Sequence, residues 1–171
     1  DYLILLASQG SRDNAEKVAR EAGLGPERHL VRVLPSPDDV KKAFQDSLEA
    51  MRALRARGFR PDEIVVDYTS GTKAMTAGVA LAGVAFGCGT LKYITGERRG
   101  GIVQPGTEQF LSIPPAGILA VNGVQTAIEL ARHLRFDAAN QLLENIREAL
   151  LTEHDRDIKN SLAHLVSAYR A

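Results

Sequence analysis

A polar turn that ends in a lysine, Thr69-Ser70-Gly71-Thr72-Lys73, stands between an apolar run and an Ala/Gly-rich stretch. A helix beginning here would present free N–H groups and a partial positive charge, which favour a phosphate. Gly71 would let a ligand approach the backbone. The charge of Lys73 in the first turn would oppose the helix dipole, and a bound anion would offset that repulsion. We interpret the turn as an anion site; the alternative is that Ser70 only caps the helix and Lys73 points into solvent.

A second polar turn, Ser8-Gln9-Gly10-Ser11, follows the first apolar run of the chain. In an open α/β sheet, ligands bind beyond the carboxyl ends of the strands, where the topology reverses. If the first and third strands are neighbours at that point, the two polar turns meet. Arg98 and Arg99 follow the fourth predicted strand and would lie at the same end of the sheet. They are candidates for phosphate contacts, with simple solvation as the alternative.

Apolar runs alternate with helical periodicity along the first two thirds of the chain. We predict strands over residues 2–7, 29–34, 63–68, 90–95 and 109–113. Helices are predicted over 12–22, from a Ser36 cap to Gly58, and over 72–86. This alternation indicates an α/β fold with a Rossmann-like, mostly parallel sheet and helices on both faces.

The pattern changes at Pro114-Pro115. Leu, Ile, Val and Ala then recur at three- and four-residue spacing over 118–134, 137–151 and 157–169, without a strand signal. We therefore predict an α/β domain over 1–115 and an all-helical segment over 116–171. Because the chain begins inside an apolar run and stops inside a helical pattern, we expect it to be a piece of a longer protein.

Composition excludes several classes of function. The 171 residues include 21 basic and 21 acidic side chains, a balance that does not favour long DNA or RNA as a partner. The single cysteine, Cys88, excludes an internal disulfide and a cysteine-cluster metal site, and it suits a cytoplasmic protein. No apolar run reaches the ~20 residues needed to cross a bilayer, so we expect no membrane partner.

Two familiar phosphate signatures are missing from the sequence. A P-loop requires G-x-x-x-x-G-K-[ST], but Lys73 has Gly71 two residues before it and Ala74 after it. The turn after the first strand contains one glycine, Gly10, and not G-x-G-x-x-G. These observations do not indicate a Walker-type ATPase or an ordinary NAD enzyme. The histidines have no partner at metal-ligand spacing, and we expect neither a metal nor a cofactor.

The segment "DYTSGTKAM", placed after an apolar strand and before a small-residue helix, resembles the CARF (CRISPR-associated Rossmann fold) domain. In particular, it resembles proteins of type III CRISPR systems in which a helical region follows CARF and a HEPN ribonuclease or other effector comes later. The resemblance covers about residues 1–115, and 116–171 correspond to the intervening helical region.

The resemblance implies a homodimer that binds a cyclic oligoadenylate, such as the tetra- or hexa-adenylate, across its twofold axis. Such a sensor would regulate an attached effector in antiviral defence. Carried onto this sequence, the binding residues are Ser8, Gln9, Gly10, Ser11, Thr69, Ser70, Gly71, Thr72 and Lys73. Two copies of a helix N-terminus and a lysine would give a symmetric cradle for a ring of phosphates.

Some CARF domains also cleave their ligand without a metal, through attack of a ribose 2′-hydroxyl on the adjacent phosphate. In such a ring nuclease, Lys73 would stabilise the developing charge, and Ser11 or Thr72 would position the phosphate. No histidine stands near these turns in the sequence, so a general base is not evident and we favour sensing. A third possibility is a generic nucleotide-binding α/β domain, which would bind mononucleotides and be indifferent to cyclic oligoadenylates.

Overall fold

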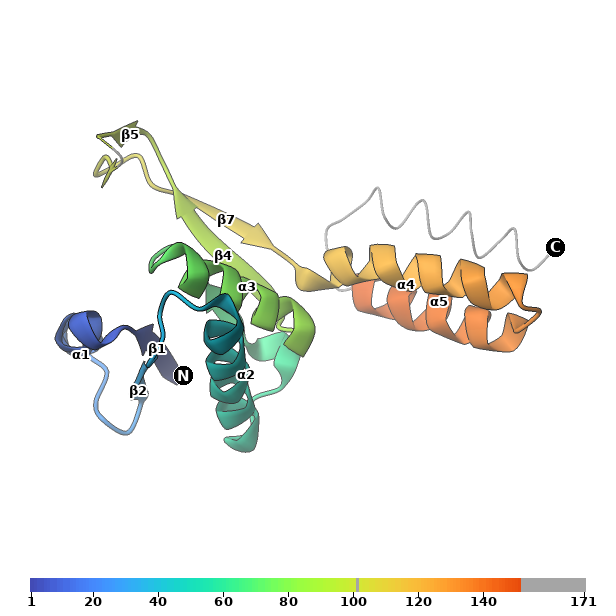
Figure 1. Cartoon of the computed structure of the whole chain (residues 1–171), viewed down its shortest axis with the longest axis horizontal. Coiled ribbons are helices and arrows are strands. Elements are labelled where there is room, and N and C mark those ends of the chain that lie inside the picture. The colour runs from blue at the N-terminus through green and yellow to red at the C-terminus, as the bar shows by residue number, and fades with distance from the viewer. Residues whose placement is uncertain (101, 152–171) are drawn as a thin grey trace. The chain divides into compact units, whose positions relative to one another are not determined.

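The computed structural model describes residues 1–100 and 102–151 and has a mixed α/β fold (Figure 1). The chain divides into two compact units, with the boundary between Ile113 and Pro114. The first unit contains all the strands and three of the α-helices in the described chain, and the second contains two α-helices. Among the described residues, no helix is long and apolar enough to cross a membrane.

The strands of the first unit form small separate sheets in the described chain. β1 (Leu3–Ala7) pairs in parallel with β2 (His29–Val33), and β3 (Val65–Asp67) pairs in parallel with β4 (Thr90–Thr95). β7 (Gln109–Ile113) joins β4 in the antiparallel direction, and Figure 1 shows these two strands as arrows that run in opposite directions. The short strands β5 (Arg98–Arg99) and β6 (Ile102–Val103) form a hairpin between β4 and β7.

The expected contact between the first and third strands is not formed. β1 is hydrogen-bonded only to β2 among the described strands, and β3 only to β4. Of the five residues of β1, only Ala7 is buried, although the apolar run suggested a strand covered on both faces. The physical reason is that β1 has a pairing partner on one side and a cavity on the other.

Three α-helices accompany these strands: α1 (Arg12–Glu21), α2 (Val40–Ala56) and α3 (Lys73–Phe86). The predicted start of α2 at Ser36 is wrong. Asp39 caps the helix, because its Oδ1 accepts a hydrogen bond of 3.1 Å from the Lys42 amide. The carbonyl oxygen of Ser36 instead accepts a hydrogen bond of 3.2 Å from the Asp39 amide, and this bond closes a turn before the helix.

The main core of the first unit lies where α2 and α3 pack on β3 and β4, and Figure 1 shows these two helices side by side. Two glycines let α3 approach its neighbours. A Cβ added at Gly78 would lie 2.7 Å from the backbone nitrogen of Phe44 in α2, and one at Gly83 would lie 2.6 Å from Cδ2 of Leu91 in β4. The small-residue character of α3 is therefore explained by packing within its own unit.

The second unit is a helical pair in which α4 (Pro115–Arg132) packs on α5 (Phe136–Leu151). Its core is made of small and aliphatic side chains, among them Ala120, Ala127, Ala131, Ala139 and Leu143. Leu134 turns the chain between the helices with φ of +57°. The helix predicted over 157–169 lies outside the described residues.

Candidate functional site

The turn before α3 is anchored by Thr72, which caps the helix. The amide of Met75 donates to the Thr72 hydroxyl at 3.2 Å, and that hydroxyl donates to the carbonyl of Pro37 in the turn before α2. The alternative in which Ser70 caps the helix is therefore wrong, because the helix begins at Lys73 and its N-cap residue is Thr72. The Thr72 hydroxyl therefore holds the turn through both hydrogen bonds, the one that it donates to Pro37 and the one that it accepts from Met75.

Gly71 has a conformation that few other residues adopt. Its φ is +116°, and a Cβ placed on it would lie 3.2 Å from Cβ of Met75. The glycine is therefore required by the backbone of the turn, whether or not a ligand approaches it.

Thr69 also makes hydrogen bonds that hold the turn in place. Its hydroxyl accepts the amide of Ile94 from β4 at 2.8 Å, and its own amide donates to the Asp67 carboxylate at 2.8 Å. Within residues 1–100 and 102–151, the Ser70 hydroxyl and the Lys73 ammonium have no hydrogen-bond or ion-pair partner. Both residues are exposed, so they are the groups of this turn that are available to a ligand.

The first polar turn is held together by its two serines. The Ser8 amide donates to Oγ of Ser11 at 2.9 Å, and the two hydroxyls lie 2.9 Å apart. Ser11 stands at the N-cap position of α1 as predicted, but its side chain makes no capping hydrogen bond to that helix. Gln9 and Gly10 are exposed at the tip of the turn, and no Cβ contact would restrict Gly10.

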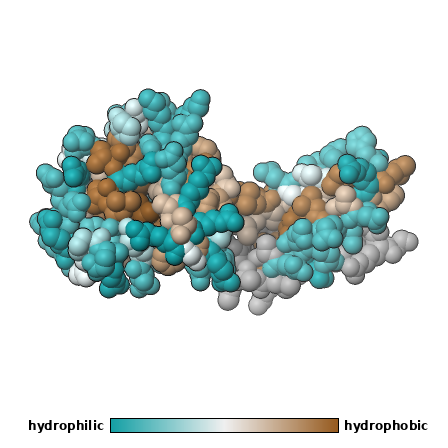
Figure 2. Space-filling model, turned by 90° about the horizontal axis from the view of Figure 1, so that it is seen from below, coloured by the Kyte–Doolittle hydropathy of each residue, from teal (hydrophilic) through white to brown (hydrophobic). Residues whose placement is uncertain are grey.

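A cavity of about 460 Å³ separates β1 from β3. Its walls are mostly apolar side chains from β1, α2 and β3, and Asp67, Thr69 and Ser70 add polar groups. Figure 2 shows that hydrophobic residues also gather on one face of the first unit, with hydrophilic residues around them. The cavity thus lies against the turn before α3, whereas Ser8, Gln9, Gly10 and Ser11 are not among its lining residues.

Two aromatic residues that we did not predict lie next to the turn. The rings of Tyr68 and Tyr93 stack with centroids 5.4 Å apart and an angle of 23° between their planes. Arg98 donates from Nη2 to the Tyr93 hydroxyl at 2.7 Å. This contact connects Arg98 to the turn through the aromatic pair, while Arg99 is exposed in β5. The sequence feature that could have pointed to this pair is the position of Tyr68, directly before Thr69.

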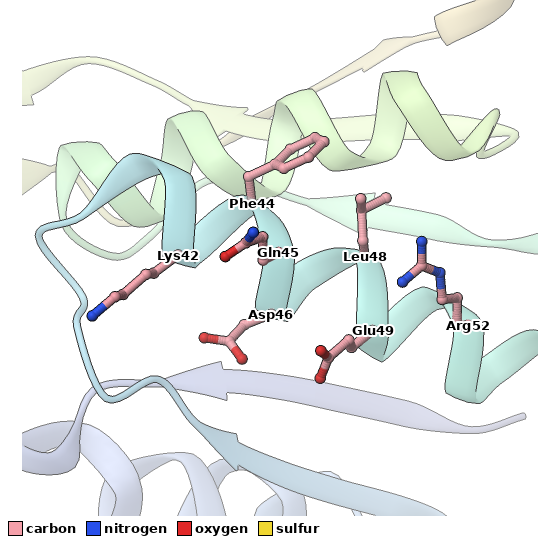
Figure 3. Close-up of a pocket in the computed structure, with 7 residues that line it drawn as sticks. All are labelled: Lys42, Phe44, Gln45, Asp46, Leu48, Glu49 and Arg52. Carbon is pink, nitrogen blue, oxygen red and sulfur yellow. The ribbon is translucent and has the colours of Figure 1, made fainter.

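A separate cavity of about 580 Å³ lies along α2, and Figure 3 shows its lining residues. Phe44 and Leu48 point toward α3 and pack on the core, whereas Asp46 and Glu49 point away from it. Both carboxylates form ion pairs with Arg32 of β2, the one with Asp46 at 3.0 Å. Because Arg32 already satisfies these acids, we assign the cluster to the packing of α2 on β2.

No protein-family model matches this chain, and a search of curated proteins finds no match. Within the described residues, no group of three or more His, Cys, Asp or Glu side chains is placed to hold a metal ion. The candidate site therefore rests on the turn before α3, the cavity beside it and the aromatic pair.

Proposed function

We propose that this chain is the sensor part of a type III CRISPR defence protein, which binds a cyclic oligoadenylate in the cytoplasm and regulates an attached effector. The observation that carries the proposal is the pair of free groups at the start of α3. Ser70 and Lys73 are exposed and without partners in the described chain, at the positive end of a helix of 14 residues. A phosphate at this point would accept hydrogen bonds and balance the lysine charge.

The proposed receptor is a homodimer with a Rossmann-like sheet. Two parallel pairs, β1 with β2 and β3 with β4, support this proposal. The pairing of β1 with β3, which is not formed in this structure, would complete the order β2-β1-β3-β4-β7. A twofold axis would bring together two copies of the turn before α3, which suits a ring with an even number of phosphates. Zero net charge is compatible with this ligand, because a local site is enough for a small anion.

The contacts of the hydroxyl groups favour sensing over cleavage. The ring-nuclease alternative assigns phosphate positioning to Ser11 or Thr72, but the Ser11 hydroxyl bonds Ser8 and the Thr72 hydroxyl bonds Met75 and Pro37. Lys73 alone would then stabilise the transition state. We therefore expect the ligand to remain intact.

The test is titration calorimetry with cyclic tetra- and hexa-adenylate, followed by chromatography of the recovered ligand. We expect one of the two rings to bind and to be recovered uncleaved. Lys73→Ala should weaken binding by about 1–3 kcal/mol, as expected for loss of a charged hydrogen-bond donor. Lys17→Ala is the matched control, because Lys17 is an exposed lysine of α1 that pairs with Glu21.

Three other outcomes would change the conclusion. Recovery of linear fragments would favour the ring nuclease. Binding of mononucleotides with indifference to both rings would favour a generic nucleotide-binding domain. Equal affinity of the Lys73→Ala and Lys17→Ala proteins for the ring would remove Lys73 from the site.

A further inference from the structure

The aromatic pair beside the turn is arranged by the register of two parallel strands. Asp67 pairs with Lys92, and the next residues along each strand, Tyr68 and Tyr93, are therefore neighbours on the same face of the sheet. The amide of Tyr68 continues the ladder by donating to the Lys92 carbonyl at 3.0 Å. Tyr68 also packs on the core formed by α2, α3, β3 and β4. Both rings are held in place by the sheet before any ligand arrives.

The pair lies at the surface and not in the interior. Both tyrosines are half-buried, and Arg98, which bonds the Tyr93 hydroxyl, is exposed. Aromatic side chains are platforms on which nucleobases stack, and arginine adds cation–π interactions to them. Tyr68 lies two residues before Ser70, so one of the two rings is close in sequence to the proposed phosphate site.

We propose that Tyr68, Tyr93 and Arg98 form a stacking platform for a purine base of the nucleotide whose phosphate is held at Ser70 and Lys73. This assignment rests on the proposed function and adds how the base, as distinct from the phosphate, is recognised. The aromatic rings supply the stacking surface, and the guanidinium group of Arg98 supplies a planar cation at its edge. The platform adds affinity for the base, and because every base has a π-face it does not by itself select adenine.

The experiment measures the affinity for cyclic tetra- and hexa-adenylate by calorimetry in the wild-type protein and in platform variants. Tyr68→Leu and Tyr93→Leu should each weaken binding ~5- to 150-fold, as expected for loss of one stacked base. Tyr68→Phe retains the ring and should bind nearly as the wild type does. Phe110→Leu is the matched control, because Phe110 is 70% exposed and pairs with Ile94, on the sheet face opposite Tyr93.

A second measurement reports stacking directly. The chain has four tyrosines and no tryptophan, so tyrosine dominates its intrinsic fluorescence. Binding of either ring should quench this emission, and the quenching should be lost in a protein carrying both Tyr68→Leu and Tyr93→Leu. Far-UV circular dichroism and thermal melting of each variant establish that it is folded.

The outcomes separate this inference from the proposed function. If the wild type binds a ring and the folded Tyr68→Leu and Tyr93→Leu proteins bind it equally well, the platform is refuted and the sensor proposal stands. If neither ring binds but adenosine monophosphate quenches tyrosine emission in a Tyr68-dependent manner, the sensor proposal fails and the platform stands. If neither probe binds, both are refuted.

Discussion

Gly78 of α3 touches Ala43 of α2 so closely that no side chain fits between them. A Cβ built on Gly78 would lie 2.7 Å from the Cβ of Ala43 and 2.9 Å from its carbonyl carbon. Ala43 is itself fully buried, and backbone atoms cannot turn aside as a side-chain end can. This contact fixes the distance between α2 and α3, and with it the position of the turns that precede both helices.

Gly78→Ala should therefore destabilise the protein. Overpacking costs about 1–3 kcal/mol, against a gain of about 1 kcal/mol in helix propensity. Gly83→Ala is the matched control in the same helix, because the closest neighbour of its new Cβ is the end of the Leu91 side chain. Urea unfolding should give a lower free energy for Gly78→Ala than for Gly83→Ala. Equal free energies of unfolding for the two variants would mean that α2 and α3 can move apart without a loss of stability.

Local sequence patterns were sufficient for several elements. Strands over 90–95 and 109–113 have the bounds that their apolar residues predict, and α1 begins directly after Ser11. The start of α2 was misplaced because Ser36-Pro37 and Asp39 are both good local start signals. Which of them caps the helix depends on whether the chain between them forms a turn.

The structure of the site depended on contacts between distant residues. Thr72 bonds Pro37, which lies 35 positions away, and Thr69 bonds Ile94, which lies 25 positions away. A single sequence does not show such partners, so all five residues of the turn looked equally available to a ligand. The stacking of Tyr68 on Tyr93 likewise requires the register of β3 and β4, which the two apolar runs do not specify.

Replacement of Thr72 should test whether its hydroxyl holds the turn before α3. Thr72→Val removes the oxygen that accepts the Met75 amide and donates to Pro37, so we expect a loss of about 1–2 kcal/mol in unfolding free energy. Thr72→Ser retains the hydroxyl and should lose much less. Chemical denaturation of both variants is the measurement, and equal stabilities would show that the hydroxyl does not hold the turn.

His29 should make stability depend on pH. Its Nδ1 lies 2.8 Å from the Gly25 carbonyl and its Nε2 lies 3.2 Å from the Glu16 carboxylate, so the doubly protonated ring donates to both. The backbone hydrogen bond to Gly25, and then the one to Glu16, raise the pKa of His29 above 6.5. Folding thus favours the protonated form.

This contribution is fully present below the pKa of the unfolded chain, near 6.5, and is lost as pH rises through the higher pKa of the folded protein. Thermal melting across this range should show a decline in midpoint for the wild type that is reduced in His29→Gln. Glu16→Gln should reduce it in part, because Glu16 is the second cause of the shift. An identical pH profile for wild type and His29→Gln would exclude this role.

Cys88 should be unreactive in the folded protein. It is 3% exposed, its Sγ lies 3.8 Å from Sδ of Met51, and burial raises the pKa of the thiol to about 11. Because the thiolate is the reactive form, we expect slow reaction with a disulfide reagent at pH 8 and rapid reaction in urea. The chain has no other cysteine, so the absorbance change that accompanies cleavage of the disulfide reagent reports this thiol alone. Rapid labelling without urea would indicate that the core around α2 and α3 opens readily.

Lys73 should lower stability while it supports binding. Its positive charge stands in the first turn of α3, where the helix dipole is unfavourable to a cation, and no carboxylate in the described chain pairs with it. Lys73→Ala should therefore raise the unfolding free energy of the ligand-free protein by about 0.3–1 kcal/mol at low salt. The gain should shrink at high salt, because the charge is exposed and screened.

Lys17→Ala, which removes an exposed ion pair, should show no such gain. Urea unfolding of the three proteins at two salt concentrations is the measurement. A loss of stability in Lys73→Ala would mean that the lysine is there to hold the fold, and the case for an anion at this turn would lose its physical basis.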